Sequence, residues 1–532
     1  MINLFQKTHK LNSSTFLKNG LKSYCTSSSN NNGNKTIKLD FIEPNKYREK
    51  INNFSSTSPK PASTSGNSLN SADDSVYSVL NTEDLILNQI KISKSPFIKV
   101  AGADIDGVLR GKYLDKDKFE SAVKKGFGFC SVIFGWDSGD VCYDNVAFTG
   151  NHTGYPDVNA KLDVGTYRTI PWEYDVPFFL MDFVKPNGEP LPICPRQVLK
   201  RVVRMCQDHQ LEPLMGMEFE WYNYREDNHT IREKSYNNLT PLTNGMFGYS
   251  LLRTSQNSEF MNSLSELRGF GVPLEGLHTE TGPGVYEAAI RFSSALEAGD
   301  RAILFKQSAK EIASLQGIIA SFMAKPYQHL PGCSGHMHQN FASPDGKNLF
   351  HDPSAPNEMS EMFKSFVAGQ LLLLPEFLPF FAPNINSYKR LVDGYWAPTT
   401  PTWGIDNRTV AIRVLKQGKA TRSEFRVPGS DVNPYISIAA SFAAGLYGVL
   451  NKLELKSPPV SQNSYDLYKQ GLVSRLPRSL SESTELLAKS TIAKELLGAE
   501  FVDHFVETRR WEYRQFNHQV HKWELERYFE II

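Results

Sequence analysis

Hydrophobic and polar positions alternate in two different ways along the first ordered part of the chain. Three apolar runs rich in β-branched and aromatic residues are typical of strands: Phe97–Ile105, Phe129–Phe134 and Val176–Asp182. Between the first two runs, Lys116–Lys125 has a helical pattern. Strands that alternate with a helix predict a small α+β domain over residues 88–190.

A second pattern begins at Pro195, because proline is favoured in the first turn of a helix and an amphipathic run, Gln197–His209, follows it. Strand-like and helical segments then mix. We expect strands at Pro213–Tyr222, His336–Phe341 and Thr409–Val414, and helices at Ser293–Met323 and Pro434–Leu450. Residues 191–532 should therefore form a second α+β domain, with a sheet braced by helices.

The first 87 residues differ from the rest in composition. Residues 1–39 contain no Asp or Glu, carry six lysines and form a basic, acid-free leader. Such a composition is typical of a mitochondrial transit segment. The lack of arginine also fits an N-terminal extension that has no targeting function. Residues 40–87 are poor in large apolar side chains and are expected to be a low-complexity linker. Cytoplasm and mitochondrial matrix are both compatible with this pattern.

The charge balance and the cysteine content limit which kinds of molecule the protein is expected to bind. The chain has 58 basic and 57 acidic side chains, a formal net charge of +1, which gives no field to recruit nucleic acid or an anionic membrane. Its most apolar stretch, Leu371–Phe381, is shorter than the roughly 20 residues of a membrane helix. Six scattered cysteines without a CxxC pair indicate a reducing compartment. We therefore expect a small-molecule substrate, with neither nucleic acid nor membrane as partner.

Two carboxylates stand at alternate positions of one predicted strand, Glu218 and Glu220. Alternation puts both on the same face of the sheet. Their neighbours Met217, Phe219 and Trp221 are bulky and apolar. A solvated strand face is the ordinary explanation for such a pair. The apolar neighbours favour instead a strand with one face in the core and the other lining a cavity.

Further acidic residues and a histidine occur in similar contexts. Glu280 and Glu287 bracket a turn-rich loop that can fold them toward one point, and His336 follows a glycine-rich turn. Glu424 shares a strand face with Arg426. Each pattern alone is more often structural. Together, five glutamates and a histidine match the oxygen-rich coordination of Mg²⁺ or Mn²⁺.

Basic residues gather near glycine-containing turns in the last third of the chain: Arg390, Arg408, Arg413, Lys419, Arg422 and Arg426. Forked guanidinium groups bind anionic ligands such as phosphate and carboxylate. The sequence has neither a Walker P-loop nor a GxGxxG turn after a strand, so a nucleotide must bind to another scaffold. Acidic metal ligands together with basic residues that bind phosphate predict a phosphoryl-transfer site.

Four short segments occur in a specific order: Phe322–Pro326, Asn386–Val392, Asn407–Thr409 and Glu424–Pro428. With the two glutamate pairs and His336, this ordered set resembles the type I branch of the glutamine synthetase family over residues 88–532. The resemblance implies a β-grasp N-terminal domain and a catalytic domain with a curved antiparallel sheet. It also implies ATP-dependent ligation of ammonia to the γ-carboxyl of L-glutamate through γ-glutamyl phosphate, in a homo-oligomer of two stacked hexamers.

The resemblance also implies roles for single residues, with ATP and two or more Mg²⁺ or Mn²⁺ ions as the ligands. One metal is assigned to Glu220, Glu280 and Glu287, and the other to Glu218, His336 and Glu424. Glutamate is assigned to Gly332, Arg390 and Arg426, and the ATP phosphates to Arg408, Arg413, Lys419 and Arg422, with Arg408 stabilising the transferred phosphoryl group. Asp137 is the catalytic residue that would bind and deprotonate ammonium from a neighbouring subunit, although Asp-Ser-Gly-Asp is also a favourable turn sequence.

Two departures from the family pattern concern the second substrate. Trp396 stands where the family has a glutamate that takes the ammonium proton, and Pro331 replaces an asparagine. An indole accepts no proton, but it offers an apolar wall and a π face that attracts cations. A γ-glutamyl-amide ligase that uses an organic amine or polyamine is therefore the alternative function. A non-catalytic structural relative is a third reading, which the retained metal ligands disfavour.

Overall fold

The computed structural model describes residues 82–532. The expected leader, residues 1–39, and residues 40–81 of the expected linker lie outside the described residues. The first element, helix α2 (Thr82–Ile92), starts inside the segment expected to be a linker. Its side chains Ile86 and Ile90 are buried, so this stretch packs against the N-terminal sheet domain.

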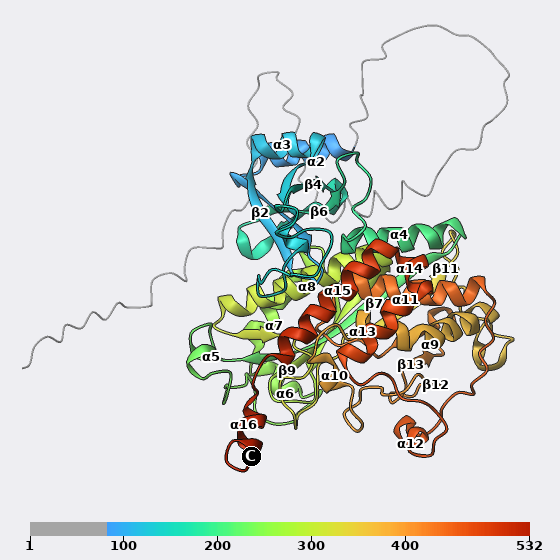
Figure 1. Cartoon of the computed structure of the whole chain (residues 1–532). Helices are drawn as coiled ribbons and strands as arrows, with labels where there is room; N and C mark the ends of the chain where they lie inside the picture. Colours follow the sequence, from blue (N-terminus) through green and yellow to red (C-terminus); the bar gives the residue numbers. More distant parts are fainter. Residues whose placement is uncertain (1–81) are drawn as a thin grey trace, which may run out of the picture. The chain divides into compact units, whose positions relative to one another are not determined.

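The N-terminal sheet has the strand order β2-β1-β6-β4-β3, and β5 pairs with β6. Figure 1 labels β2, β4 and β6 of this sheet, close to helices α2 and α3. The strands are β1 (Phe97–Ala103), β2 (Leu109–Asp115), β3 (Phe127–Cys130), β4 (Asp157–Leu162), β5 (Arg168–Ile170) and β6 (Val176–Val184). β1 and β6 run parallel, and the other pairs are antiparallel. Helix α3 (Lys116–Lys125) begins where Asp115 accepts a hydrogen bond from the Lys118 amide, and it buries Phe119. Asp115 is a favourable N-cap residue, which explains the position of this helix.

One predicted strand of this domain is only half correct. The segment expected as a strand over Phe129–Phe134 pairs with β4 only as far as Cys130. Ser131–Phe134 instead forms a short 3-10 helix, which ends where the Gly135 amide donates to the Val132 carbonyl. β4 begins at Asp157, the partner of Cys130, so no strand is available to continue the ladder.

The second sheet has the order β12-β13-β14-β11-β7-β9-β8, and β10 pairs with β7. Its strands are β7 (Glu212–Tyr224), β8 (Leu274–Thr279), β9 (Val285–Ser294), β10 (Ile319–Ser321), β11 (Met337–Ala342), β12 (Trp403–Ile405), β13 (Ile412–Leu415) and β14 (Arg422–Phe425). All pairs are antiparallel except β12 with β13. The predicted α+β class, with a second sheet braced by helices, is confirmed.

The second domain also contains helices of different lengths, some of which pack against one face of this sheet. The longer ones are α4 (Pro195–Asp208), α8 (Ala295–Leu315), α9 (Glu361–Phe381), α11 (Pro434–Leu450) and α15 (Ala499–Asn517). The shorter ones are α5 (Thr230–Glu233), α6 (Leu251–Ser255), α7 (Ser258–Ser265), α10 (Ser387–Arg390), α12 (Ser464–Lys469), α13 (Leu480–Lys489), α14 (Thr491–Leu497) and α16 (Lys522–Tyr528). The helix predicted over Ser293–Met323 is shorter than expected, because Gly317 has φ +66° and the chain then enters β10.

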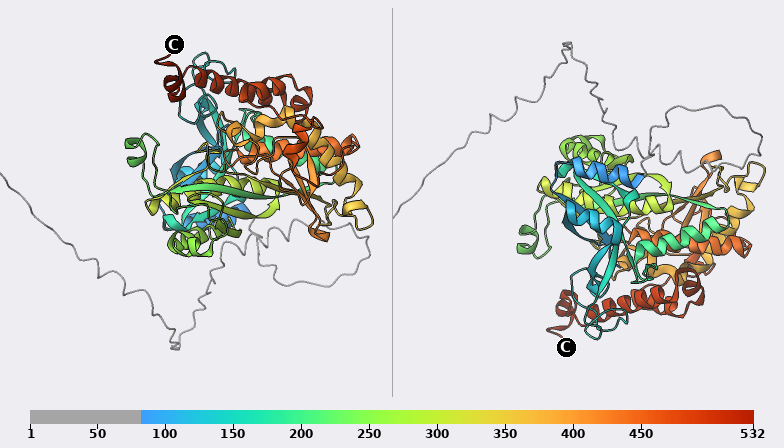
Figure 2. Two further views of the ribbon diagram at one scale, coloured as in Figure 1. Left: turned by 90° about the horizontal axis from the view of Figure 1, so that it is seen from below. Right: turned by 90° about the horizontal axis from the view of Figure 1, so that it is seen from above.

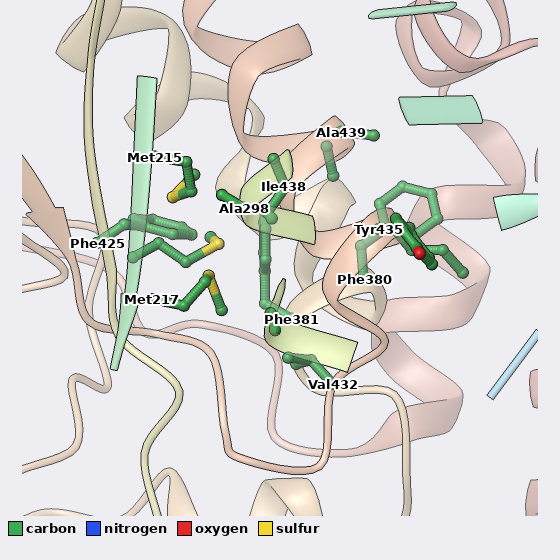
Figure 3. Packing of buried hydrophobic residues seen from close by; sticks show 14 of the residues in the cluster. Met215, Met217, Ala298, Phe380, Phe381, Phe425, Val432, Tyr435, Ile438 and Ala439 are labelled. Atoms are coloured by element: carbon green, nitrogen blue, oxygen red, sulfur yellow. The ribbon is translucent and has the colours of Figure 1, made fainter. Parts of the chain in front are cut away.

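The core between sheet and helices fixes which face of each strand is polar. Met217 of β7 and Phe425 of β14 point toward α9 and α11, where they meet Phe381 and Ile438 (Figure 3). Successive side chains of a strand point to opposite faces. The residues next to Met217 and Phe425 therefore face away from the helices, and Glu218 and Glu424 are among them.

A buried ion cluster joins the N-terminal sheet to the helices of the second domain. The guanidinium group of Arg196, in the first turn of α4, donates to both oxygens of Asp300 at 2.8 Å, to Asp163 at 2.8 Å and to Asp182 at 3.0 Å. Tyr435 of α11 donates to Asp300 at 2.7 Å. One arginine thus connects β6 and the residue after β4 with α4 and α8.

Loop 135–156 of the N-terminal domain extends to α15, as Figure 2 shows. Asn145 Nδ2 donates to the Glu507 carbonyl at 2.8 Å, and the rings of Tyr143 and Trp511 pack edge to face at 5.2 Å.

No helix in residues 82–532 is long and apolar enough to cross a membrane.

Replacing Arg196 with methionine should lower the free energy of unfolding by about 3–5 kcal/mol, because the buried carboxylate of Asp300 then loses its cationic partner, whereas Asp163 and Asp182 keep Lys200. Thermal and urea unfolding would measure the loss. The matched control is Arg510→Met, which breaks an exposed pair with Glu485 and should cost less than about 1 kcal/mol. Equal effects of the two substitutions would contradict this role for Arg196.

Candidate active site

The first acidic cluster consists of Glu218, His336, His338 and Glu424, from β7, β11 and β14. His338 faces Glu424 across the β11–β14 ladder, and its Nε2 lies 2.9 Å from Glu218 Oε1. His336, just before β11, places Nδ1 at 3.6 Å from Glu218 Oε2 and 3.5 Å from Glu424 Oε1. Ligand atoms of Glu218, His338 and Glu424 all lie within 4.8 Å of one another.

The second acidic cluster consists of Glu220, His278, Glu280 and Glu287, from β7, β8, β9 and the β8–β9 turn. Register brings three of them together, since Glu287 pairs with Glu220 on one side and with His278 on the other. The turn folds back as expected, because the Glu280 amide donates to the Val285 carbonyl at 2.9 Å. His278 lies 4.0 Å from the Glu280 carboxylate and 3.8 Å from that of Glu287.

The two clusters differ in electrostatics. In the first, His338 and His336 hold the pKa of Glu218 well below its usual range, although burial opposes this. Arg426 and His336 likewise lower the pKa of the buried Glu424 to about 2. In the second, burial and the neighbouring Glu220 and Glu218 raise the pKa of Glu287 to about 9. Burial also raises the pKa of Glu220 to about 7. The second cluster therefore lacks positive charge.

The donor sets of both clusters fit divalent cations. Carboxylate oxygens with an imidazole nitrogen suit Mg²⁺ and Mn²⁺, and no cysteine belongs to either cluster. His336 Nε2 is buried and has no hydrogen-bond partner within residues 82–532. A bound cation would supply the positive charge that Glu220 and Glu287 lack.

Two arginines donate to the carboxylate of Glu424, one to each oxygen. Arg413 Nη1 donates to Glu424 Oε2 at 2.7 Å, and Arg426 Nη1 donates to Glu424 Oε1. Arg413 also contacts Asp406 through Nη2 at 2.5 Å. Both guanidinium groups, which the sequence pointed to as anion-binding groups, thus lie against the first acidic cluster and orient Glu424.

Arg390 lies between the loop before β11 and the end of β14. Its guanidinium group donates to the Val427 carbonyl at 2.7 Å and to Ser334 Oγ at 3.0 Å. Gly332 allows this approach, because a Cβ there would lie 2.8 Å from Arg390 Cγ. The Ser334 amide in turn donates to Glu220 Oε2 at 2.6 Å. Arg390 and Gly332 are therefore adjacent to the second acidic cluster.

A cavity of about 1210 Å³ opens beside the first acidic cluster. Glu218 and His338 line one end, and Lys419, Arg422 and the exposed Phe292 line further parts. Arg422 Nε donates to His338 Nδ1 at 3.1 Å, which connects the cavity wall to the cluster. A space of this size with basic and aromatic walls suits a nucleotide.

Arg408 and Asp137 do not join either cluster within the chain. Arg408 is exposed, and its carbonyl accepts a hydrogen bond from Arg426 Nε at 3.1 Å. Asp137 Oδ1 accepts from the Gly139 amide at 2.9 Å and the Val141 amide at 2.8 Å. In the described part of the chain, no hydrogen bond or ion pair connects Asp137 to the clusters, and its side chain caps a turn.

Segment 391–398, which we call the aromatic segment, follows α10 and Arg390 directly. Trp396 is 60% exposed and has φ +60°, a conformation that a bulky side chain rarely adopts. Such backbone strain is found mostly at functional sites. Tyr465 fixes the end of the segment by donating to the Ala397 carbonyl at 3.0 Å.

Two histidines of the clusters were not assigned from the sequence. His338 lies within the strand predicted over His336–Phe341, but the sequence pattern assigned no role to it. His278 stands two positions before Glu280, so alternation along β8 was the signal that could have found it. Tyr249 was also missed; its ring lies 4.6 Å from the His278 ring, and no spacing in the sequence indicated that contact.

Two carboxylate-imidazole clusters on one face of a largely antiparallel sheet, with two arginines bound to Glu424 and a nucleotide-sized cavity beside the first cluster, define a metal-dependent phosphoryl-transfer enzyme. The chain matches the family "Glutamine synthetase, catalytic domain" over residues 192–528. It is 79% identical over 455 residues to type-1 glutamine synthetase 2 of Dictyostelium discoideum, covering 85% of this chain and 87% of that protein. The protein belongs to the glutamine synthetase family.

A second relative and a solved structure extend the comparison. The chain is 37% identical over 438 residues to glutamate–isopropylamine ligase of a Pseudomonas species, covering 82% of this chain and 95% of that protein. The solved structure of GmaS in complex with ADP has a TM-score of 0.74 at 24% identity and covers 84% of this chain and 99% of that one. The latter likeness shows the shared fold.

Binding of Mg²⁺ or Mn²⁺ at pH 8 should release about one proton per chain. Glu287, with a pKa raised to about 9, is mostly protonated at this pH, and a cation requires the ionised carboxylate. Affinity should therefore rise as pH increases toward 9. Titration calorimetry in two buffers of different ionisation enthalpy measures the release, and Glu287→Gln should remove it. Identical heats in both buffers for the unsubstituted protein would contradict the assignment.

Proposed function

We propose that the protein is an ATP-dependent ligase that joins ammonia to the γ-carboxyl of L-glutamate through γ-glutamyl phosphate. The observation that carries the proposal is the juxtaposition of the two acidic clusters with Arg390, Arg413 and the nucleotide-sized cavity. The Dictyostelium relative, a type-1 glutamine synthetase by name, supports the same reaction.

In the proposed reaction, the two clusters would hold two or more Mg²⁺ or Mn²⁺ ions, which would supply positive charge to neutralise the ATP phosphates. Glu220, Glu280 and Glu287 would hold one ion, and Glu218, His336 and Glu424 the other. The present geometry adds His278 and His338 to the groups that could contribute. Within the first cluster, Arg413 and Arg426 keep Glu424 ionised and fixed in orientation.

The chain's cationic side chains would bind and orient the two anionic substrates. Lys419 and Arg422, on the cavity wall, would contact the ATP phosphates together with Arg413. Arg390, Arg426 and Gly332 would bind glutamate, whose γ-carboxylate would attack the γ-phosphorus of ATP while the bond to the β–γ bridging oxygen breaks and ADP leaves. The exposed Arg408 is free to reach the transferred phosphoryl group and stabilise its charge.

A second candidate reaction uses an organic amine or polyamine in place of ammonia. The observation that favours it is Trp396, an exposed indole where an ammonia-using site needs a proton acceptor. An indole attracts an alkylammonium through its π face and shields an alkyl group from water. One relative is an isopropylamine ligase by name. A structural, non-catalytic role is disfavoured because both clusters are complete.

We also propose that the active unit is a ring-based homo-oligomer, with two stacked hexamers as the expected form. Asp137 supports this, since within residues 82–532 no hydrogen bond or ion pair links its side chain to the clusters, and its carboxylate caps its own turn. An adjacent subunit would bring the N-terminal domain, residues 88–190, to the catalytic domain, residues 191–532. Asp137 would then complete the ammonium site.

The direct test is glutamate-dependent phosphate release from ATP, with Mg²⁺ and either ammonium or a panel of mono-, di- and polyamines. The highest kcat/KM with ammonium would establish the proposed reaction, and preference for an organic amine would establish the second candidate. Glu287→Ala should abolish turnover with every amine by removing one ligand from the second cluster. Unchanged turnover in this variant would contradict the metal assignment.

Replacing Trp396 with glutamate should raise kcat/KM for ammonium by about tenfold or more, because a positioned base contributes about 10²–10⁴-fold to such rates. The same change should lower kcat/KM for alkylamines, which lose their apolar wall. Steady-state kinetics with both substrates would measure the ratio. Trp396→Phe, the control, retains an aromatic wall without a base, so a gain with ammonium in both variants would show that loss of the indole, not a new base, is responsible.

A further inference from the structure

Lys325 is a buried cation without a carboxylate partner. It belongs to the sequence segment Phe322–Pro326, which has no role in the site described above, and it is only 5% exposed. Its ammonium group donates to the Leu330 carbonyl at 2.5 Å and lies 3.8 Å from the centre of the Tyr395 ring. Within residues 82–532, no ion pair links it to an acid. A buried lysine normally needs such a partner, so this position requires an explanation.

The backbone of Lys325 is tied to the helix that carries Arg390. Asn386 precedes α10 and binds Lys325 twice: Oδ1 accepts from the Lys325 amide at 2.8 Å, and Nδ2 donates to the Lys325 carbonyl at 3.0 Å. The Leu330 carbonyl, which accepts from the ammonium group, lies two residues before Gly332. Lys325 therefore connects α10 with the loop that leads to Ser334.

The third connection of Lys325 is to the tip of the aromatic segment. Asp393, near its start, accepts hydrogen bonds from Thr399 at 2.8 Å and Arg475 at 2.5 Å, and Tyr465 holds the Ala397 carbonyl near its end. Between these anchors, Gly394 and Trp396 both have positive φ. The cation–π contact of Lys325 with Tyr395 holds this strained tip against the loop before β11.

We propose that Lys325 is a positioning residue that holds the aromatic segment over the acyl-phosphate site, so that an amine and not water reaches it. This inference rests on the proposed function. In the second step, the amine nitrogen attacks the γ-carbonyl carbon, the carbon–oxygen bond to phosphate breaks, inorganic phosphate leaves with the electron pair, and the nitrogen loses a proton. Water attacking the same carbon regenerates glutamate, so ATP is consumed without amide formation.

A cation–π contact suits this task because it holds the ring without fixing it rigidly. The tip must open to admit the substrates and release the product. A salt bridge between two buried charges is more costly to break than an ammonium–ring contact. When the ring moves away, the ammonium group of Lys325 can keep its hydrogen bond to the Leu330 carbonyl, so the buried charge still has a partner.

The experiment measures the ratio of phosphate released to amide formed, with saturating glutamate and the preferred amine. Lys325→Met should raise this ratio about three- to tenfold, the range expected for loss of one ammonium–ring contact. Tyr395→Leu should do the same, whereas Tyr395→Phe keeps the aromatic face and should retain tight coupling. KM for ATP should be unchanged in all three variants, since neither Lys325 nor Tyr395 lines the nucleotide-sized cavity.

Lys112→Met is the matched control. It removes a lysine that lies 4.5 Å from the Phe129 ring in the N-terminal domain, and it should leave the ratio unchanged. The double variant Lys325→Met with Tyr395→Leu should be no worse than the worse single variant, because both substitutions remove the same contact.

The outcomes separate the two proposals. Absence of glutamate-dependent phosphate release from the unsubstituted protein would overturn the proposed function. Tight coupling in the unsubstituted protein that persists in both Lys325→Met and Tyr395→Leu would overturn the role of Lys325 alone. If Lys325→Met does not fold, Tyr395→Leu decides, since this side chain is partly exposed and its removal leaves the lysine bonded to Leu330.

Discussion

Repulsion among carboxylates that share one face of the second sheet constrains the rest of this structure. Glu218 and Glu220 leave β7 on the same side as Glu287 on β9 and Glu424 on β14, and burial strengthens their repulsion. Each must be protonated, paired with a cationic side chain, or bound to a metal. The helices on the opposite face hold this arrangement in place, because Met217 and Phe425 alternate with the acids and cannot leave the core.

The protein resolves this repulsion differently in its two clusters. Glu424 has two arginines and Glu218 has two histidines, so the first cluster is already ionised and oriented. Among the described residues, no lysine or arginine forms an ion pair with Glu287; its basic neighbour is His278, and burial with the nearby carboxylates raises its pKa to about 9. The second cluster therefore depends on a metal ion for its charge balance, and its binding should be the more sensitive to pH. The two clusters therefore differ in ionisation: without a metal ion, the carboxylates of the first are charged and Glu287 of the second is protonated.

Local sequence signals predicted much of the fold, and long-range contacts explain the remainder. α3 and α11 have the predicted bounds because capping residues and apolar periodicity are local. The strand expected over Phe129–Phe134 was half wrong because strand length depends on a partner, here β4. Likewise, strand alternation identified Glu218 and Glu220, whereas the pairing of His278 with Glu287 depends on register between β8 and β9. Lys325 and Tyr395 are 70 positions apart in the chain, so neither apolar periodicity nor strand alternation could predict their contact.

Binding stoichiometry of Mn²⁺, measured by equilibrium dialysis or electron paramagnetic resonance at pH 8, tests most directly the claim that the acidic face holds cations at two separate places. Two ions per chain are expected for the unsubstituted protein. Glu287→Gln should bind only one of them with the original affinity, because it alters the second cluster and leaves the first intact. Two ions bound with unchanged affinity after that substitution, or none bound before it, would contradict the account.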